Sequence, residues 1–172
     1  LLALKKNGGV VQIVAFGSYI KTQKPDSPER ATALTSLRRE FNLPDPPRGQ
    51  SGGARSILAQ LSVERCEEYE RMRAEIDKNF PGDPPATVKD FVDHIDYAVK
   101  LISIEHVAIA SDFDGGGGVV GWNDASETFN VTLELVRRGY AEEQIGKLWS
   151  GNLLRVMDEV QRVARELQAK ES

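Results

Sequence analysis

Two carboxylates followed by a run of glycines are the residues of this chain whose types and spacing best suit chemistry. Asp112 and Asp114 come directly after a short apolar segment, and glycines occupy positions 115–118. Ligands of parallel α/β folds bind at the carboxyl ends of the strands, so these acids would lie on an open rim where a carboxylate could exchange a proton. The alternative is a structural loop in which Asp112 or Asp114 only caps a backbone turn.

Three sharper interpretations compete at this loop. Glycines at positions 116, 118 and 121 match a dinucleotide-binding pattern, but the two preceding carboxylates would repel a pyrophosphate. A calcium-binding loop that begins at Asp112 would need Glu at its twelfth position, where Asn123 stands. The third interpretation is the acid of a metal-assisted hydrolase, which requires metal ligands, and this chain is poor in them.

Histidine and cysteine give little support to a second site. His94 and His106 are the only histidines, and we expect both to have structural roles through hydrogen bonds or packing. His106 opens the second apolar segment, so it would lie at the end of that strand opposite to Asp112. The single cysteine, Cys66, excludes an intrachain disulfide and a cysteine-cluster zinc site.

The composition is that of an ordinary globular protein with about one domain. The chain has 172 residues, of which 40% are hydrophobic and 28% charged. Its net charge of −4 argues against nucleic acid as a partner, because phosphate neutralisation requires a basic face. No apolar run approaches the ~20 residues that span a bilayer, and no signal peptide is visible, so the compartment stays open.

Two short apolar segments, residues 9–17 and 106–111, predict buried strands. Nearly continuous apolar runs of this length are typical of strands that are covered on both faces in a parallel sheet. Two strands cannot form a stable sheet of this kind alone. Further strands therefore either lie in the Pro- and Gly-rich residues 21–56 or lie outside this chain, and we favour the second alternative.

Helices are predicted around these strands, in the order of an α/β protein. Thr87 and Asp90 form a capping-box pattern, which opens an amphipathic helix that should end at about Ile102. A charged helix over residues 62–80 should be exposed to solvent. Other helices are expected over residues 1–7, from Pro28 with Ser27 as its cap, from about Asp124 to Gly139, and over residues 142–149 and 152–167.

Several of these segments resemble the renal (membrane) dipeptidase family of zinc metallopeptidases, which has an amidohydrolase-type barrel. The similarity lies in residues 7–13, 91–102, 106–115, 130–140 and 151–156, in the family's order. The most specific part is the Asp-Phe-Asp-Gly block at 112–115 joined to the Asn-Leu-Leu-Arg-Val block at 152–156.

The resemblance implies an α/β fold that is the C-terminal portion of a (β/α)8 TIM-type barrel. Residues 10–16 would be the seventh strand and residues 106–111 the eighth, with flanking helices. Residues 1–172 would be the C-terminal part of one barrel domain, because a whole barrel needs about 250 residues. Residues 21–86 would be a helical insertion, a long excursion between strand and helix within that domain.

The resemblance also implies roles for single residues. Asp112 falls on the family's acid at the end of the last strand, which would accept a proton from a metal-bridging water and pass it to the leaving amine. Phe16, Tyr19, Asp114 and Gly115 would bind substrate on the same rim. Two zinc ions would act in the complete enzyme, with ligands on strands upstream of this chain, and no metal ligand is expected among these residues.

The implied function is zinc-dependent hydrolysis of dipeptides, with the missing N-terminal part of the barrel as partner. The chain by itself would then be inactive, and a homo-oligomer is left open. One alternative is a non-catalytic fragment or degenerate paralogue that acts as a binding module. Another is a different amidohydrolase-type hydrolysis on the same scaffold, because a fold does not determine its substrate.

Overall fold

The computed structural model describes residues 1–44, 58 and 60–171. Within this part of the chain, β1 (Val11–Val14) and β2 (Val107–Ala110) form a two-stranded parallel sheet. Val11 pairs with Val107 and Val14 pairs with Ala110, so both strands end at the same edge. The parallel pairing of these two apolar segments was predicted, and β2 is buried as expected, whereas β1 is only partly buried, with Gln12 exposed. No further strand is present in the described part of residues 21–56.

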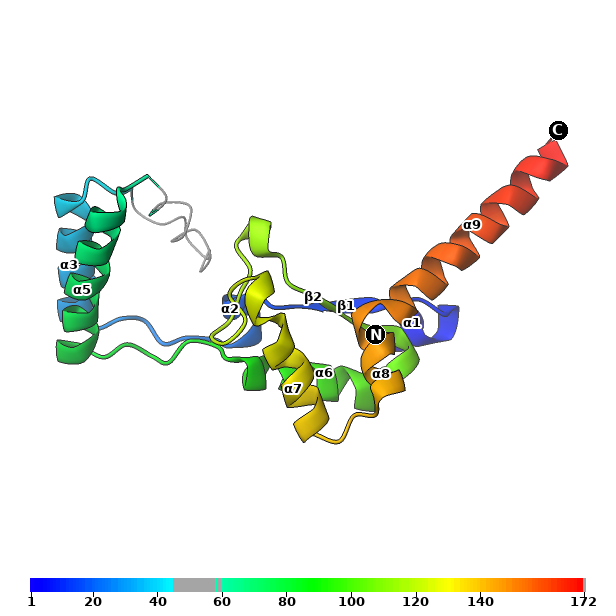
Figure 1. Ribbon diagram of the computed structural model, residues 1–172. Coiled ribbons are helices and arrows are strands. Elements are labelled where there is room, and N and C mark those ends of the chain that lie inside the picture. Colours follow the sequence, from blue (N-terminus) through cyan, green and yellow to red (C-terminus); the bar gives the residue numbers. More distant parts are fainter. Residues whose placement is uncertain (45–57, 59, 172) are drawn as a thin grey trace.

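Five helices accompany this sheet, and together with it we call them the α/β body (Figure 1). They are α1 (Leu2–Asn7), α6 (Val88–Ile102), α7 (Thr128–Arg137), α8 (Glu142–Gly146) and α9 (Asn152–Glu171). None of the helices in the described ranges combines the length and the apolar character that a membrane span requires. The body therefore has the mixed helix-and-sheet composition that the order of segments predicted.

Helix α6 contributes more buried residues to the core than any other element. The predicted capping box is present: Asp90 N–H donates to the Thr87 hydroxyl over 3.3 Å, and Thr87 N–H donates to the Asp90 carboxylate over 2.8 Å. The apolar stripe of the helix faces the sheet, where Phe91, Val92 and Ile95 are fully buried. The helix ends at Ile102, as its periodicity predicted.

A polar network joins α6 to α7 on the side away from the sheet. The Arg138 guanidinium donates to Asp96 over 2.7 Å and to Glu134 over 3.0 Å, and it also reaches Asp93. The Tyr140 hydroxyl donates to Asp96 over 2.6 Å, and burial together with this bond raises the pKa of Tyr140. These side chains are paired with one another, so they act as structural links.

Helix α9 is anchored at its first turn and then leaves the body (Figure 1). The buried amide of Asn152 donates to the carbonyl oxygens of Ile104 and Val107 over 2.6 and 2.8 Å. Arg155 donates to Gly8 and Glu105 carbonyls at the same end of the sheet. Beyond this turn, large apolar side chains are exposed along the helix: Met157, Val160, Val163 and Leu167.

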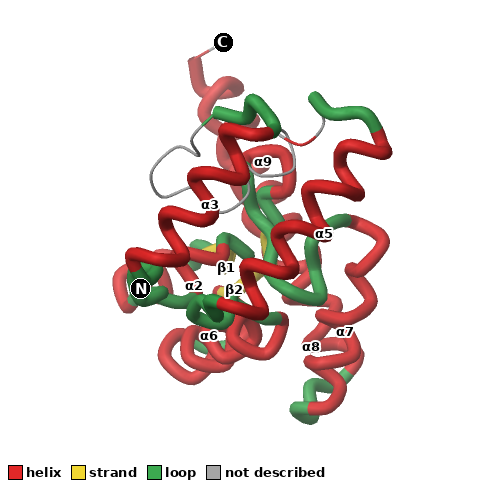
Figure 2. The backbone as a smooth tube through the Cα atoms, turned by 90° about the vertical axis from the view of Figure 1, so that its left-hand side faces the viewer, coloured by secondary structure: helices red, strands yellow, loops and turns green. Residues whose placement is uncertain are grey.

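The segment between β1 and α6 leaves the body and returns to it. It contains the short α2 (Gly17–Ile20) and two longer helices, α3 (Pro28–Glu40) and α5 (Val63–Asn79), which lie side by side (Figures 1 and 2). We call the latter two the α3–α5 pair. Ser27 caps α3 by accepting the Arg30 N–H, as predicted. Helix α5 is exposed, as its charge pattern predicted, and its only buried residue is Tyr69.

Several boundaries differ from those expected. The strand expected over residues 9–17 spans only Val11–Val14, and the last helix runs to Glu171. The helix expected from Asp124 starts with the 3-10 turn η3 (Ala125–Glu127), because Asp124 accepts the Ser126 N–H, and α7 follows from Thr128. His106 belongs to the 3-10 turn η1 (Ile104–His106) because its N–H donates to Ser103, so β2 begins at Val107. The helix expected to end at residue 149 instead continues through a π-helical segment, η4 (Lys147–Gly151), into α9.

Candidate functional site

The segments that follow the two strands meet at the carboxyl edge of the sheet. Ala15 N–H donates to the Ala110 carbonyl over 2.9 Å, which continues the ladder beyond β1. Gly118 N–H then donates to the Ala15 carbonyl over 2.5 Å, and Phe16 forms a parallel bridge with Gly118. The sequence therefore places the loop that carries Asp112 directly beside the residues that follow β1. We call this edge, with the residues after both strands, the carboxyl rim.

Asp112 lies at a sharp turn at the end of β2. Its backbone is left-handed, with φ 55 and ψ 34, which is uncommon for a residue with a side chain. Its carbonyl accepts the N–H groups of Gly115 and Gly117 over 3.1 and 2.6 Å. A Cβ atom at position 117 would lie 2.1 Å from the Ser111 carbonyl oxygen, so this turn requires glycine there.

The Asp112 carboxylate takes no part in that turn. The side chain is exposed, it does not cap the 3-10 turn η2 (Phe113–Gly115), and no described residue forms a hydrogen bond or ion pair with it. The turn is closed by the backbone carbonyl alone. The structural alternative, in which the carboxylate of Asp112 only caps backbone, therefore receives no support from the geometry.

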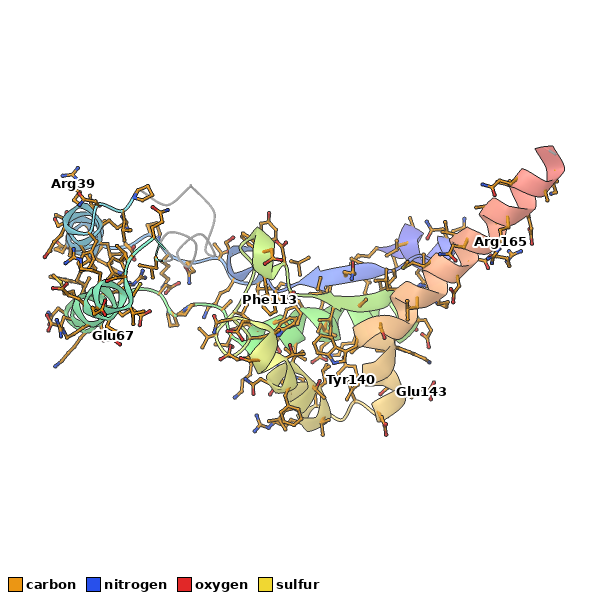
Figure 3. The ribbon with its side chains drawn as sticks, turned by 45° about the horizontal axis from the view of Figure 1, so that its top comes forward. Arg39, Glu67, Phe113, Tyr140, Glu143 and Arg165 are labelled. Carbon is orange, nitrogen blue, oxygen red and sulfur yellow. The ribbon has the colours of Figure 1, made fainter. Side chains whose placement is uncertain are left out.

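An aromatic cluster fixes this loop to the core. The Phe113 ring, whose position is labelled in Figure 3, belongs to the loop after β2. It packs edge-on against Trp122 with centroids 5.4 Å apart. Trp122 also contacts Phe91 and Trp149, and its indole N–H donates to the Thr128 hydroxyl over 3.1 Å. Because Phe113 is anchored in this cluster, the exposed Asp112 and Asp114 on either side of it are presented to solvent.

The other predicted site residues occupy the same rim in different environments. Phe16 is buried, and the ring of Tyr19 stacks on it with centroids 4.6 Å apart while remaining 75% exposed. Asp114 and Gly115 are exposed in η2. The structure thus brings the predicted acid and the predicted aromatic residues to neighbouring loops. Their roles in catalysis and in substrate binding remain predictions.

The glycines at positions 116, 118 and 121 do not open a helix. Each has a positive φ, and the segment between them pairs with the start of α6. Val120 N–H donates to the Ala86 carbonyl over 2.8 Å, and Val88 N–H donates to the Val120 carbonyl over 3.0 Å. A dinucleotide site needs a helix N-terminus directly after these glycines, so this interpretation is wrong.

Both histidines are bound to backbone carbonyl oxygens. His94 Nε2 lies 2.9 Å from the Ile20 oxygen, and His106 Nδ1 lies 2.8 Å from the Gly9 oxygen, at the end of the sheet opposite to Asp112. Among residues 1–44, 58 and 60–171, no three side chains of His, Cys, Asp or Glu gather as a metal site. These residues by themselves therefore do not fit a two-zinc centre.

Sequence reasoning missed a groove of about 610 Å³ that adjoins the carboxyl rim. Gly17 and Gly118 line it from the rim, while Arg30 and Arg73 line it from the α3–α5 pair. These residues are far apart in the sequence and share no motif or period. No pattern in the sequence could have indicated that they surround one groove.

Comparisons with known proteins agree on one family. The family described as membrane dipeptidase (peptidase family M19) matches residues 1–171. Dipeptidase ataJ of Aspergillus terreus is 42% identical over 95 residues, which cover 55% of this chain and 23% of ataJ. Dipeptidase aclJ of Aspergillus oryzae is 40% identical over 83 residues, which cover 48% of this chain and 20% of aclJ.

A solved structure is similar over nearly the whole chain. The crystal structure of the probable dipeptidase PvdM from Pseudomonas aeruginosa matches with a TM-score of 0.57 and 40% sequence identity. The match covers 94% of this chain and 39% of PvdM. The matches thus span only a minor part of each of these relatives, whereas the similarity to PvdM extends over both the α/β body and the α3–α5 pair.

Proposed function

This chain belongs to the membrane dipeptidase family, and on that premise we propose that it contributes the catalytic acid of a dipeptide hydrolase. The chain would be the C-terminal portion of a (β/α)8 barrel, with β1 as the seventh strand and β2 as the eighth. The parallel register and the shared carboxyl edge support this placement. An N-terminal part of the barrel would complete the sheet, which is consistent with a match to only 39% of PvdM.

The single observation that carries the proposal is the exposed Asp112 carboxylate at the end of β2, in a turn that does not use it. Asp112 would accept a proton from the water that attacks the peptide carbonyl carbon. When the C–N bond breaks, Asp112 would return that proton to the leaving amine nitrogen. General acid–base catalysis of this kind typically contributes about 10² to 10⁴ in rate.

The neighbouring residues of the carboxyl rim would bind the substrate. The stacked rings of Phe16 and Tyr19 provide an apolar surface on the β1 side. Asp114 and Gly115 follow the acid on the β2 side, where residues 115–122 would shape specificity. Asp112 could also hold the free amino group of a dipeptide before the proton transfer, because a carboxylate accepts hydrogen bonds from an ammonium group.

We propose that the hydrolysis depends on zinc, with zinc ligands that lie outside the residues of this chain. The described residues do not fit a zinc centre, so we place the ligands of two zinc ions in the N-terminal part of the barrel. The proposed contribution of this chain is the acid and one side of the substrate site. Relatives named dipeptidases favour a dipeptide as the substrate over another amide or a lactone.

The proposal is tested by replacing the two rim acids one at a time in the full-length enzyme. Asp112→Asn should lower kcat about 10² to 10⁴-fold while the zinc content stays unchanged. Asp114→Asn, the matched exposed acid two residues away, should act mainly on KM. Normal kcat in Asp112→Asn would refute the assigned role, and loss of zinc in that variant would place Asp112 among the metal ligands instead.

A further inference from the structure

The groove beside the carboxyl rim is built by polar contacts at the base of the α3–α5 pair. Lys24 N–H donates to the Asp83 carboxylate over 3.0 Å, and Gln23 donates to the Pro84 carbonyl over 3.5 Å. These bonds join the two chain segments that lead from the body to the pair. All four of these residues line the groove, so these bonds join two parts of its wall.

Arg30 also lines the groove, and each of its three guanidinium nitrogens has a partner. It is only 8% exposed, and its guanidinium lies 2.8 Å from Asp26, 2.7 Å from Asp77 and 2.6 Å from the Phe80 carbonyl. The ion pairs and hydrogen bonds raise the pKa of Arg30 despite its burial. Arg30 therefore supports the groove and has no donor group directed to a ligand.

The charged side chains that line the groove differ in whether their polar atoms have hydrogen-bond partners. Its carboxylates already accept hydrogen bonds: Asp26 and Asp77 from Arg30, and Asp83 from the Lys24 backbone. In contrast, no described residue accepts a hydrogen bond from the Lys24 ammonium group. Arg73 reaches Asp77 only through its Nε atom, over 3.9 Å, and its two terminal nitrogens contact no described acceptor.

The groove adjoins the carboxyl rim at Gly17 and Gly118. Gly17 follows Phe16 directly, and Gly118 is the residue that bridges to Phe16 across the rim. A substituent that leaves the rim on this side would enter the groove and meet the donors of Lys24 and Arg73. An anionic group would satisfy both donors, whereas the three carboxylates of the groove already accept hydrogen bonds.

We propose that this groove binds a carboxylate of the substrate and makes the enzyme prefer dipeptides with an Asp or Glu side chain. The inference rests on the proposed dipeptide hydrolysis and names a substrate class for it. The two cations are partly exposed, so their combined effect on kcat/KM should be about tenfold.

The test compares acidic dipeptides with neutral ones of the same shape in the full-length enzyme. The ratio of kcat/KM for Ala-Glu over Ala-Gln, and for Glu-Ala over Gln-Ala, should exceed one in at least one pair. Lys24→Gln combined with Arg73→Gln should lower that ratio about tenfold and leave the hydrolysis of the neutral peptide unchanged. Arg71→Gln, an exposed cation on the same helix but another face, should leave the ratio unchanged. An equal ratio in wild type and in the double variant would overturn the proposal.

A binding measurement separates this inference from the proposed function. Titration of the 15N-labelled full-length enzyme with glutarate should shift the resonances of Lys24 and of the Arg73 side chain, and the neutral glutaramide should not. The Lys24→Gln and Arg73→Gln double variant should lose the glutarate effect. Site-specific shifts in a protein that hydrolyses no dipeptide would refute the proposed function and keep the anion site. Absence of shifts at these two residues would refute the anion site.

Discussion

The α/β body and the α3–α5 pair are stabilised in different ways. In the body, α6, both strands and the aromatic cluster around Trp122 share one apolar core, with Phe91, Ile95 and Ile102 completely buried. In the pair, a small cluster of Leu37, Phe41, Leu43 and Tyr69 joins the two helices. At the base of the pair, Arg30 joins the start of α3 to the end of α5 through Asp77 and the Phe80 carbonyl. The rim therefore rests on a buried apolar core, whereas the groove beside it depends on a few polar contacts.

The largest expected effect on stability comes from the body. Trp122 is 2% exposed and contacts Phe91, Phe113 and Trp149, so Trp122→Ala should cost about 3–5 kcal/mol of the free energy of unfolding. Urea denaturation followed by far-UV circular dichroism measures this change. Tyr97→Ala, on the exposed face of α6, should change stability by less than about 0.5 kcal/mol. Similar costs for both variants would contradict the assignment of the core.

A smaller and local effect is expected from the base of the pair. Arg30→Gln removes the cation paired with Asp26 and the nearer of the two cations paired with Asp77, and should cost about 1–3 kcal/mol because those carboxylates are partly exposed. Amide hydrogen exchange should show faster exchange in α3 and α5 and unchanged exchange in α6. Arg65→Gln, which breaks only the exposed pair with Glu68, is the control and should cost at most about 1 kcal/mol. Uniform loss of protection in both regions would mean that they unfold as one unit.

Substitutions at two helix caps should affect the α/β body and the α3–α5 pair differently. Thr87→Ala and Ser27→Ala each remove a side-chain acceptor at a helix N-terminus, so each should cost about 1 kcal/mol. The loss at Thr87 should appear in global unfolding, because α6 carries the core of the body. The loss at Ser27 should appear only in the hydrogen exchange of α3. A global effect of Ser27→Ala would show that the pair supports the body.

The smallest expected effect is the dependence of stability on pH that arises at the cap formed by Thr87 and Asp90. The Thr87 side chain, and then its backbone N–H, lower the pKa of Asp90. The folded-state pKa is thus below the unfolded value of about 3.9, so this stabilisation is complete above that pH and is lost as pH falls through the folded value. The loss should stay below about 1 kcal/mol. Thr87→Ala should reduce this acid-dependent part, because only the backbone N–H bond to Asp90 remains, and an unchanged pH profile in that variant would contradict it.

Local signals in the sequence predicted most of the body. The caps at Ser27 and Thr87, the apolar stripe of α6 and the two apolar strands each depend on residues close together in the chain, so their patterns were sufficient. The position of Asp112 at the carboxyl end of β2 followed from the same reasoning. The dinucleotide interpretation was wrong because Val120 pairs with Ala86 and Val88, residues that lie more than thirty positions away.

The features that could not be predicted depend on contacts between distant residues. Arg30 meets Asp77 and the Phe80 carbonyl, and Lys24 meets Asp83, without any period or motif that links them. The groove is formed by these contacts, so it was invisible in the sequence. The π-helical segment η4 was also missed, since residues 147–151 carry no signal that separates it from an α-helix.

We propose that this chain supplies the acid of a dipeptide hydrolase, and that the zinc ligands lie in an N-terminal part of the same barrel. The most direct measurement is the hydrolysis of Ala-Gln in the presence of zinc, together with the zinc content, for the 172-residue chain alone and for the full-length enzyme. The account predicts hydrolysis and two bound zinc ions in the full-length enzyme and neither in the chain alone. A full-length protein that binds two zinc ions and hydrolyses no dipeptide would contradict it.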